Sequence, residues 1–403
     1  MTDSEQKTDA GSTIGGPATL SSGPQWRRLW LLLLLLVVAV SAAQRFVGIA
    51  QDPAFQIHSD DLLWMDRFRE LPRTAQPGEE PHYGHGIDTP ALERYVFHYL
   101  LLWTGRMPGQ LPRWDYDQSF EWNVAQGNVA PAEAVRLVRV VNAVFMIAAT
   151  VIVYVAFAGT VGGLAGLVAA LYLVLSSGVV DVLWSIGPDP LLWMLLSVAL
   201  LLWARLPATW WAAVVVGAVG GLATSAKLNG SIAVAGYCLW LLIKRRPLWA
   251  LYAAAAAFVV FAATNPFVFS NGVLRMPQLA GQMFTYRAHK GMLFAQDYDQ
   301  HHGTHYADAP RWMVFFWLMG KLWVLLPLTL VSRRFLLLRP LAFGCTALAV
   351  GHALAVTTPV GRYTLPIDAG LAWAAIAAYW PRPLRLPTLE LLKRWWARRR
   401  EGG

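Results

Sequence analysis

Long apolar runs, separated by short polar stretches, dominate the pattern of the chain. Many of the runs are near 20 residues long, about the length that an α-helix needs to cross the hydrocarbon core of a bilayer. The pattern therefore predicts an all-α polytopic membrane protein with about ten transmembrane helices. Their expected ranges, each placed to within about 2–4 residues, are 30–47, 135–157, 162–180, 186–204, 208–226, 229–243, 247–264, 312–331, 335–356 and 364–380.

Composition and charge agree with this class of protein. The 403 residues are 56% hydrophobic and only 14% charged, unlike an ordinary soluble protein. The net charge of +9 is not the mark of a nucleic-acid-binding surface, because much of it clusters beside the ends of apolar runs. Cytoplasmic loops of membrane proteins carry an excess of Lys and Arg, so these clusters are expected in the cytoplasm. They are Arg27 and Arg28, Lys244 to Arg246, Arg333 and Arg334, and Lys393 to Arg400.

This orientation divides the chain into three parts. Residues 1–28 are rich in Ser, Thr, Gly and Pro and are expected to be a disordered cytoplasmic N-terminus. Residues 29–380 form the transmembrane domain, whose first run is an uncleaved span because SAAQRF is a poor cleavage context. Residues 381–403 form a basic cytoplasmic tail. The two large polar loops, 51–133 and 265–310, then share the outer face, where the chemistry is expected.

Inside the first outer loop, residues 91–103 are too short to cross a bilayer. The segment carries Glu93, Arg94 and His98 on part of its surface, and it predicts an amphipathic helix that lies in the membrane interface.

The adjacent carboxylates Asp60 and Asp61 follow the first span, with a short apolar segment, residues 62–65, behind them. A close pair of carboxylates titrates as a coupled unit, and one of them can then act as a general base. The alternative is that Ser59 and Asp60 cap a short helix, since both are good N-cap residues.

Lys227 and Asp189 are polar residues between or at the ends of apolar runs on the predicted outer face. Lys227, in TSAKLNG, either extends to the lipid headgroups or offers its charge to a lipid phosphate. Asp189, in GPDPLL, is expected as a helix N-cap with Pro190 at the first helical position, although it also faces the outer side.

Further positive charge lies on the outer face, against the usual bias of membrane proteins, and indicates an anionic ligand. Arg362, in TTPVGRYTLP, stands close to the membrane beside Tyr363. Its guanidinium group is a natural bidentate partner for phosphate. Arg287, His289 and Lys290 add to this charge in the second outer loop.

A metal site is not favoured. His301 and His305 have the i, i+4 spacing of metal ligands, with His302 beside the first, but the surrounding Gly and Pro indicate a loop. Contacts with a substrate are an alternative role for these residues. Cys238 and Cys345 lie within apolar runs, and we interpret them as small hydrophobic residues rather than a disulfide or metal ligands.

Together these features resemble the GT-C superfamily of membrane glycosyltransferases. More narrowly, they are similar to the group of protein O-mannosyltransferases and lipid A aminoarabinose transferases. The family usually has Asp-Glu where this chain has Asp60 and Asp61. The other matching pieces are DTPALERYVFHYL, RLVRVVNAVFMI, PDPLLWML, TSAKLNG, NPF and GRYTLP, in the same order and with a common sidedness.

The resemblance implies transfer of a sugar, with inversion, from a polyprenyl-phosphate carrier to an acceptor on the outer side of the membrane. In that family the first residue of the acidic pair is the catalytic base, which corresponds to Asp60, while the change from Asp-Glu keeps Asp61 as the alternative. Arg362 and Lys227 are the expected phosphate-binding residues, with Arg287 and Lys290 in reserve. The expected substrate contacts are Asp189, Tyr286, His289, His305 and Tyr363.

The expected partners are therefore a polyprenyl-phosphate-linked sugar, a glycan, lipid or protein acceptor, and the bilayer of a bacterial inner membrane or a plasma membrane, but no nucleic acid. No cofactor is expected. The rival interpretation is a transporter or flippase for lipid-linked sugars, which needs the phosphate contacts but no base. Transporters often have repeated halves with paired broken helices, a pattern that this sequence lacks.

Overall fold

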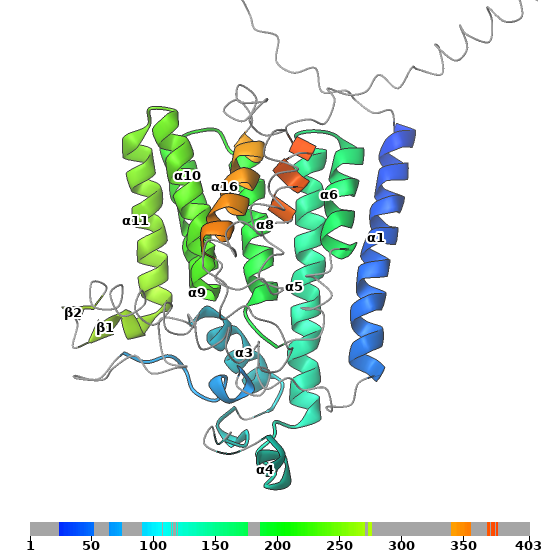
Figure 1. Cartoon of the computed structure of the whole chain (residues 1–403), viewed down its shortest axis with the longest axis vertical. Helices are drawn as coiled ribbons and strands as arrows, with labels where there is room; N and C mark the ends of the chain where they lie inside the picture. The colour runs from blue at the N-terminus through cyan, green and yellow to red at the C-terminus, as the bar shows by residue number, and fades with distance from the viewer. Residues whose placement is uncertain are drawn as a thin grey trace, which may run out of the picture.

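The computed structural model describes residues 24–51, 64–74, 91–106, 108–113, 115, 118, 120–175, 186–270, 273–275, 340–355, 369–370, 372–374 and 376–377. Within these residues the protein is mainly helical (Figure 1). The helices of the main bundle are α1 (Pro24–Gln51), α5 (Ala132–Ala158), α6 (Gly163–Leu175), α8 (Asp189–Arg205), α9 (Trp210–Ala226), α10 (Ser231–Ile243), α11 (Pro247–Thr264) and α16 (Pro340–Ala355).

The smaller elements gather at one end of this bundle, which we call the α3 end (Figure 1). They include α3 (Leu92–Trp103), η1 (Pro108–Gln110), α4 (Phe120–Ala125), and the 3₁₀ turns η2 (Leu228–Gly230) and η3 (Pro266–Val268). The strands β1 (Phe269–Ser270) and β2 (Val273–Leu274) pair antiparallel, with Phe269 opposite Leu274. The turn between α10 and α11, which holds the basic cluster Lys244 to Arg246, lies at the opposite end (Figure 1).

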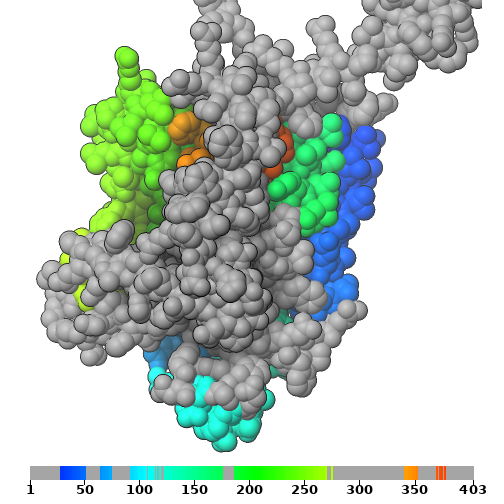
Figure 2. Space-filling view, viewed as in Figure 1, coloured from blue at the N-terminus to red at the C-terminus, as the bar shows by residue number. Residues whose placement is uncertain are grey.

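Length and composition make three helices in the described ranges suitable for crossing a membrane. These segments are Arg28–Ala50, Ala132–Ala158 and Pro247–Thr264. In the space-filling view, α1 and the pair of α10 and α11 flank the molecule on opposite sides (Figure 2). Their outward side chains are largely apolar, as Leu32 in α1 and Leu248, Leu251 and Val259 in α11 illustrate, each more than half exposed. Such surfaces suit contact with lipid.

The prediction of apolar helices is confirmed in the described parts of the ranges 30–47, 135–157, 162–180, 186–204, 208–226, 229–243, 247–264 and 335–356, where α1, α5, α6, α8, α9, α10, α11 and α16 lie. The range 312–331 lies outside the described residues, and 364–380 lies largely outside them. The total of about ten spans therefore stays a prediction. The short β1–β2 pair is an addition to the all-α prediction, and it lies inside the expected outer loop 265–310.

Glycines bring α9 and α11 into close contact. A Cβ atom added at Gly217 would overlap the backbone of Ala253, and one added at Gly221 would overlap the backbone of Ala257. Small residues at helix interfaces let the backbones approach, and this packing replaces the hydrophobic driving force that is missing between helices in lipid. The close approach holds the carboxyl-terminal ends of α9 and α11 together at the α3 end.

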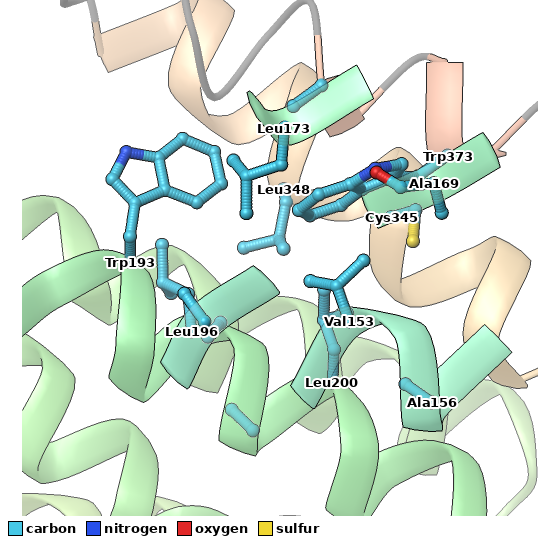
Figure 3. Close-up of a cluster of buried hydrophobic side chains, with 14 of the residues drawn as sticks. Val153, Ala156, Ala169, Leu173, Trp193, Leu196, Leu200, Cys345, Leu348 and Trp373 are labelled. Carbon is cyan, nitrogen blue, oxygen red and sulfur yellow. The ribbon is translucent and has the colours of Figure 1, made fainter. Parts of the chain in front are cut away.

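Trp373 lies in a buried apolar cluster between several helices of the bundle (Figure 3). Its indole packs edge-on against Trp193 of α8, with ring centroids 5.9 Å apart, and its Nε1 donates a hydrogen bond of 3.1 Å to the carbonyl oxygen of Ala169 in α6. Val153 of α5 and Cys345 of α16 belong to the same buried cluster. Helices distant in the sequence are thereby packed around one core.

The segment that follows the first span packs against α3. The rings of Phe68 and Phe97 have centroids 4.9 Å apart, and both side chains are fully buried. Arg94 of α3 donates hydrogen bonds to the carbonyl oxygens of Arg67, at 3.2 Å, and Glu70, at 3.1 Å. Residues 64–70 and α3 thus form one unit that lies on the ends of the bundle helices.

Candidate active site

An ion pair joins α8 to the end of α9 at the α3 end. Lys227 is the first residue after α9, and its extended backbone (φ −156°) ends the helix. Its Nζ donates to Oδ1 of Asp189 at 2.6 Å, and the two side chains are 20% and 18% exposed. Asp189 stands in the first turn of α8, where the helix dipole favours a negative charge. The structure therefore holds a partly buried cation and anion side by side.

The expectation that Asp189 is an N-cap residue is wrong. Pro188 holds the N-cap position of α8, Asp189 is the first helical residue, and Pro190 is the second. The Asp189 carboxylate binds Lys227 from a different helix. Lys227 in turn directs its ammonium group toward Asp189, which accounts for its partial burial.

Glu93 of α3 lies close to this ion pair. Its side chain is 0% exposed, and neither carboxyl oxygen has a hydrogen-bond partner among the described residues. Burial raises the pKa of Glu93 well above its ordinary value, and the negative charge of Asp189 raises it further. The positive charges of Arg67 and Lys227 act on the Glu93 pKa in the opposite direction. Three charged residues from three other segments of the chain therefore act on Glu93.

The predicted helix at residues 91–103 is confirmed as α3, and the structure shows which of its sides faces the protein. Glu93 and Arg94 are buried, whereas Tyr99, Leu102 and Trp103 are exposed. The reason is that the polar side of α3 meets charged and backbone groups at the end of the bundle. The exposed aromatic and apolar side is then free to face a membrane interface, where Tyr and Trp are enriched.

Arg67 belongs to a helical turn at residues 64–67. Its guanidinium carbon lies 4.6 Å from the ring centroid of Trp64, a cation–π distance. Trp64 in turn approaches the loop before α8, since a Cβ atom added at Gly187 would lie 3.6 Å from its Nε1. This turn therefore lies at the α3 end, beside the start of α8.

Asn265, the residue after α11, ties three helices together. Its Oδ1 accepts a hydrogen bond of 2.7 Å from the backbone nitrogen of Ala91, directly before α3. Its Nδ2 donates to Oγ of Ser225 in α9 at 3.0 Å and to the carbonyl oxygen of Phe261 in α11 at 2.8 Å. This amide is buried and satisfied, so it sets where α3, and with it Glu93, lies relative to the bundle.

Three further polar side chains are buried, one near the Lys227–Asp189 ion pair and two in the first half of α5. His352 of α16 lies close enough to Lys227 and Asp189 to experience both charges, and its Nδ1 contacts the carbonyl oxygen of Leu348 at 2.8 Å. Arg139 and Asn142 of α5 are also buried. Polar residues within apolar helices are costly, and this cost marks them as candidates for function.

Glu93, Arg67 and His352 were not predicted as site residues. A signal existed for two of them, because Glu93 interrupts the apolar segment LERYVFHYLLLW and His352 lies inside a predicted span. No signal distinguished Arg67 from the other arginines of residues 57–73, since only its burial does so.

Most of the predicted site residues lie outside the described residues, so their roles stay predictions. They are Asp60, Asp61, Tyr286, Arg287, His289, Lys290, His305, Arg362 and Tyr363. His301 and His302 also lie outside them. Within the described ranges, no group of three or more His, Cys, Asp or Glu residues is arranged to hold a metal ion. Asp189 and Lys227 are the two predicted residues that the described structure brings together.

No protein-family model and no curated protein sequence matches the chain. Solved structures do. An oligosaccharyltransferase from Archaeoglobus fulgidus, in complex with Zn and sulfate, matches with a TM-score of 0.50 and 14% identity over 90% of this chain and 50% of that one. ArnT from Cupriavidus metallidurans in the apo state matches with a TM-score of 0.49 and 16% identity, over 91% of this chain and 61% of that one. The third structure is the archaeal oligosaccharyltransferase AglB from Archaeoglobus fulgidus, in complex with an inhibitory peptide and a dolichol-phosphate. It matches with a TM-score of 0.48 and 12% identity, over 88% of this chain and 50% of that one.

The chain spans about half to three-fifths of the length of these proteins. The likeness is one of fold, and it confirms the resemblance inferred from the sequence at that level. This chain therefore shares the fold of the archaeal oligosaccharyltransferase structure, and three of its described helices are long and apolar enough to cross a membrane.

Proposed function

We propose that this protein is an inverting glycosyltransferase that moves a sugar from a polyprenyl-phosphate donor to an acceptor hydroxyl on the outer side of the membrane. The observation that carries the proposal is the partly buried Lys227–Asp189 ion pair beside Glu93, at one end of an apolar helix bundle. A charged phosphate at the membrane surface would reach such a cation, while the polyprenyl tail stays in lipid. The GT-C fold supports the same class of enzyme.

The reaction would proceed in one displacement. The oxygen of the acceptor hydroxyl forms a bond to the anomeric carbon of the sugar, and its proton passes to a carboxylate base. The bond between that carbon and the phosphate oxygen breaks, and the phosphate leaves with the bonding electron pair as polyprenyl phosphate. Attack from the face opposite to the leaving group inverts the configuration at the anomeric carbon.

In this mechanism Asp60 is the general base, with Asp61 as the alternative. Lys227 and Arg362 stabilise the charge that develops on the phosphate, and Arg287 and Lys290 lie in reserve. Asp189 holds Lys227 in place in the absence of donor and contacts the sugar when the ammonium group turns to the phosphate. Tyr286, His289, His305 and Tyr363 complete the proposed substrate contacts. The transferred group is a hexosyl or pentosyl unit, and the acceptor is a glycan, a lipid or a protein.

The test is incubation of the purified protein, reconstituted in nanodiscs, with a panel of polyprenyl phosphates that carry radiolabelled sugars, with and without a membrane extract as the acceptor source. We expect the label to move to a product while unlabelled polyprenyl phosphate is released. A heat-inactivated sample is the control. Movement of the intact labelled donor across proteoliposomes, without release of sugar, would instead identify a transporter or flippase.

A further inference from the structure

The buried carboxyl group of Glu93 has no structural partner among the described residues. Its side chain is 0% exposed, and both oxygens are without a hydrogen bond there. Burying a polar group without a hydrogen bond is costly, and most native structures avoid it. A group of this kind next to an ion pair is a candidate for contact with a ligand.

The charges around Glu93 favour an anion as that ligand. Arg67 and Lys227 each contribute one positive charge, and Asp189 contributes one negative charge. Burial and the charge of Asp189 both raise the pKa of Glu93, which favours the neutral form of this carboxyl group. With Glu93 neutral, the four residues carry one net positive charge. A single phosphodiester anion would balance it.

We propose that Glu93 is a further catalytic residue, whose protonated carboxyl group donates a hydrogen bond to a phosphate oxygen of the polyprenyl-phosphate donor. This inference rests on the proposed function, and it assigns Glu93 and Lys227 to the same phosphate. No proton is transferred in this contact. An ionised Glu93 would repel the phosphate and would have no hydrogen to donate.

The contact would contribute to catalysis as well as to binding. A donor phosphodiester carries one negative charge, and the leaving polyprenyl phosphate gains a second as the sugar departs. Hydrogen bonds to charged oxygens are stronger than neutral ones, so the bond from Glu93 strengthens as the charge develops. An interaction that is stronger in the transition state than in the ground state accelerates the reaction.

Other titratable and charged groups lie at this end of the molecule, and the test has to separate them. Asp189 of α8, Lys227 after α9 and Arg67 of residues 64–70 act on Glu93 directly. His352 of α16 experiences the charges of Lys227 and Asp189. Two more arginines, Arg94 of α3 and Arg139 near the start of α5, are buried as well. Among these groups, His352 is the one histidine, and histidine is the residue type whose ordinary pKa lies between roughly 5 and 8.

The experiment measures binding of farnesyl methyl phosphodiester to the detergent-solubilised full chain from roughly pH 6 to 9. This probe keeps a single negative charge throughout, and lysine stays protonated over the same range. The proteins are the wild type, Glu93→Gln, Glu93→Leu, His352→Gln and Glu133→Gln. Glu133 is the matched control, because its side chain is 78% exposed and pairs with Arg106 away from the ion pair.

The wild type should bind less tightly as the pH rises through the raised pKa of Glu93, by roughly tenfold per pH unit above it. Glu93→Gln keeps a hydrogen-bond donor and cannot ionise, so its affinity should stay flat with pH. Glu93→Leu should bind more weakly at low pH and lower kcat by roughly 10²–10³-fold, the effect of losing one donor to a developing oxyanion. Glu133→Gln should behave as the wild type does, and His352→Gln should keep the wild-type pH dependence whatever its affinity.

Three results would overturn the inference while the proposed function stands, and the first two concern the pH profiles. One is a pH profile of Glu93→Gln that matches the wild type, and the other is loss of the pH dependence in His352→Gln instead. Wild-type affinity for Glu93→Leu would also exclude the contact. If the wild type fails to bind the probe at any pH, the phosphate site itself is absent and the proposed function fails.

Discussion

At the scale of single residues, Lys227 and Asp189 share one short charge-assisted hydrogen bond. Each of the two side chains is about four-fifths buried. Partial burial reduces the screening that weakens pairs on an open surface. The ammonium group is thus held ready at the end of the bundle, and an arriving phosphate competes with Asp189 for it. Glu93 adds a buried carboxyl group nearby that has no hydrogen-bond partner among the described residues.

Lys227→Met should weaken binding of farnesyl methyl phosphodiester by roughly 10- to 100-fold, the usual worth of a hydrogen bond to a charged group. Lys227→Arg keeps the charge and is the matched control, expected to lose less. Asp189→Asn should bind this sugarless probe at least as tightly as the wild type, because the competing carboxylate charge is gone. Isothermal titration of the purified variants measures all three. Equal affinity of Lys227→Met and wild type would remove Lys227 from the phosphate site.

Glu93→Met should raise the thermal stability of the protein. It replaces a buried carboxyl group, which has no hydrogen bond within the described part of the chain, by an apolar group of similar length. This change removes a cost of about 1–3 kcal/mol. The pKa of Glu93 in the folded protein is raised above its ordinary value of 4.5. At pH values between the ordinary pKa and the raised one, the folded protein therefore binds more protons than the unfolded chain. The contribution of Glu93 to stability therefore falls as the pH rises through this window.

The advantage of Glu93→Met in Tm should accordingly be larger at about pH 8 than at about pH 5. Thermal unfolding followed by intrinsic fluorescence at both values checks this expectation, with Glu133→Met as the exposed control. A lower Tm for Glu93→Met at both values would show that the carboxyl group has a stabilising partner.

At the element scale, Asn265 decides where α3 lies. Its amide bonds to Ala91 before α3, to Ser225 in α9 and to Phe261 in α11. The glycine-lined contact between α9 and α11 brings the ends of these two helices near enough for one side chain to join them. Glu93 stands two residues after Ala91, so the same hydrogen bonds control its position.

Asn265→Ala should loosen α3 without unfolding the bundle. It leaves the buried nitrogen of Ala91 and the Ser225 hydroxyl with fewer partners, and we expect a loss of about 1–3 kcal/mol in local stability. Amide hydrogen exchange of residues 91–97 should become faster, and donor binding should weaken. Thr104→Ala removes side-chain hydrogen bonds at the other end of α3 and serves as the control. Unchanged exchange in Asn265→Ala would mean that other contacts hold α3.

The whole molecule presents two different ends. One is the α3 end, with its buried charged cluster, and the other holds the basic turn between α10 and α11 (Figure 1). A glycosyltransferase and a lipid-linked sugar transporter would both use such a bundle, and they differ in their need for a base.

Asp60→Asn separates these two activities. The amide retains the shape of the side chain but cannot accept a proton, so turnover of a transferase should fall by roughly 10²–10⁴-fold. Donor binding should barely change, because the phosphate contacts are assigned to Lys227 and Arg362. Arg362→Ala should instead weaken binding as well as rate. Product formation and donor binding, measured side by side for both variants, provide the readout.

A transporter should keep most of its translocation in Asp60→Asn. Full transferase activity in Asp60→Asn would move the base to Asp61. Full activity in both Asp60→Asn and Asp61→Asn would rule out the mechanism proposed here.

The sequence alone determined the apolar helices and the candidate role of Lys227 and Asp189. Apolar runs of near-spanning length leave the backbone no stable alternative to a helix in lipid, so helix positions follow directly from the pattern. The basic clusters similarly predict the orientation. Polar residues at the ends of apolar runs stand out because few such residues occur there.

Only the tertiary structure decided which of these residues meet. Lys227 and Asp189 are 38 residues apart, and their pairing depends on how α8 and α9 pack. The inward direction of Glu93 was missed because periodicity shows that α3 has two faces but not which one meets the protein. That choice depends on Asn265, 174 residues after Ala91, and on charged groups from three other segments. Such contacts have no local signature, because their free energy exists only once the bundle has formed.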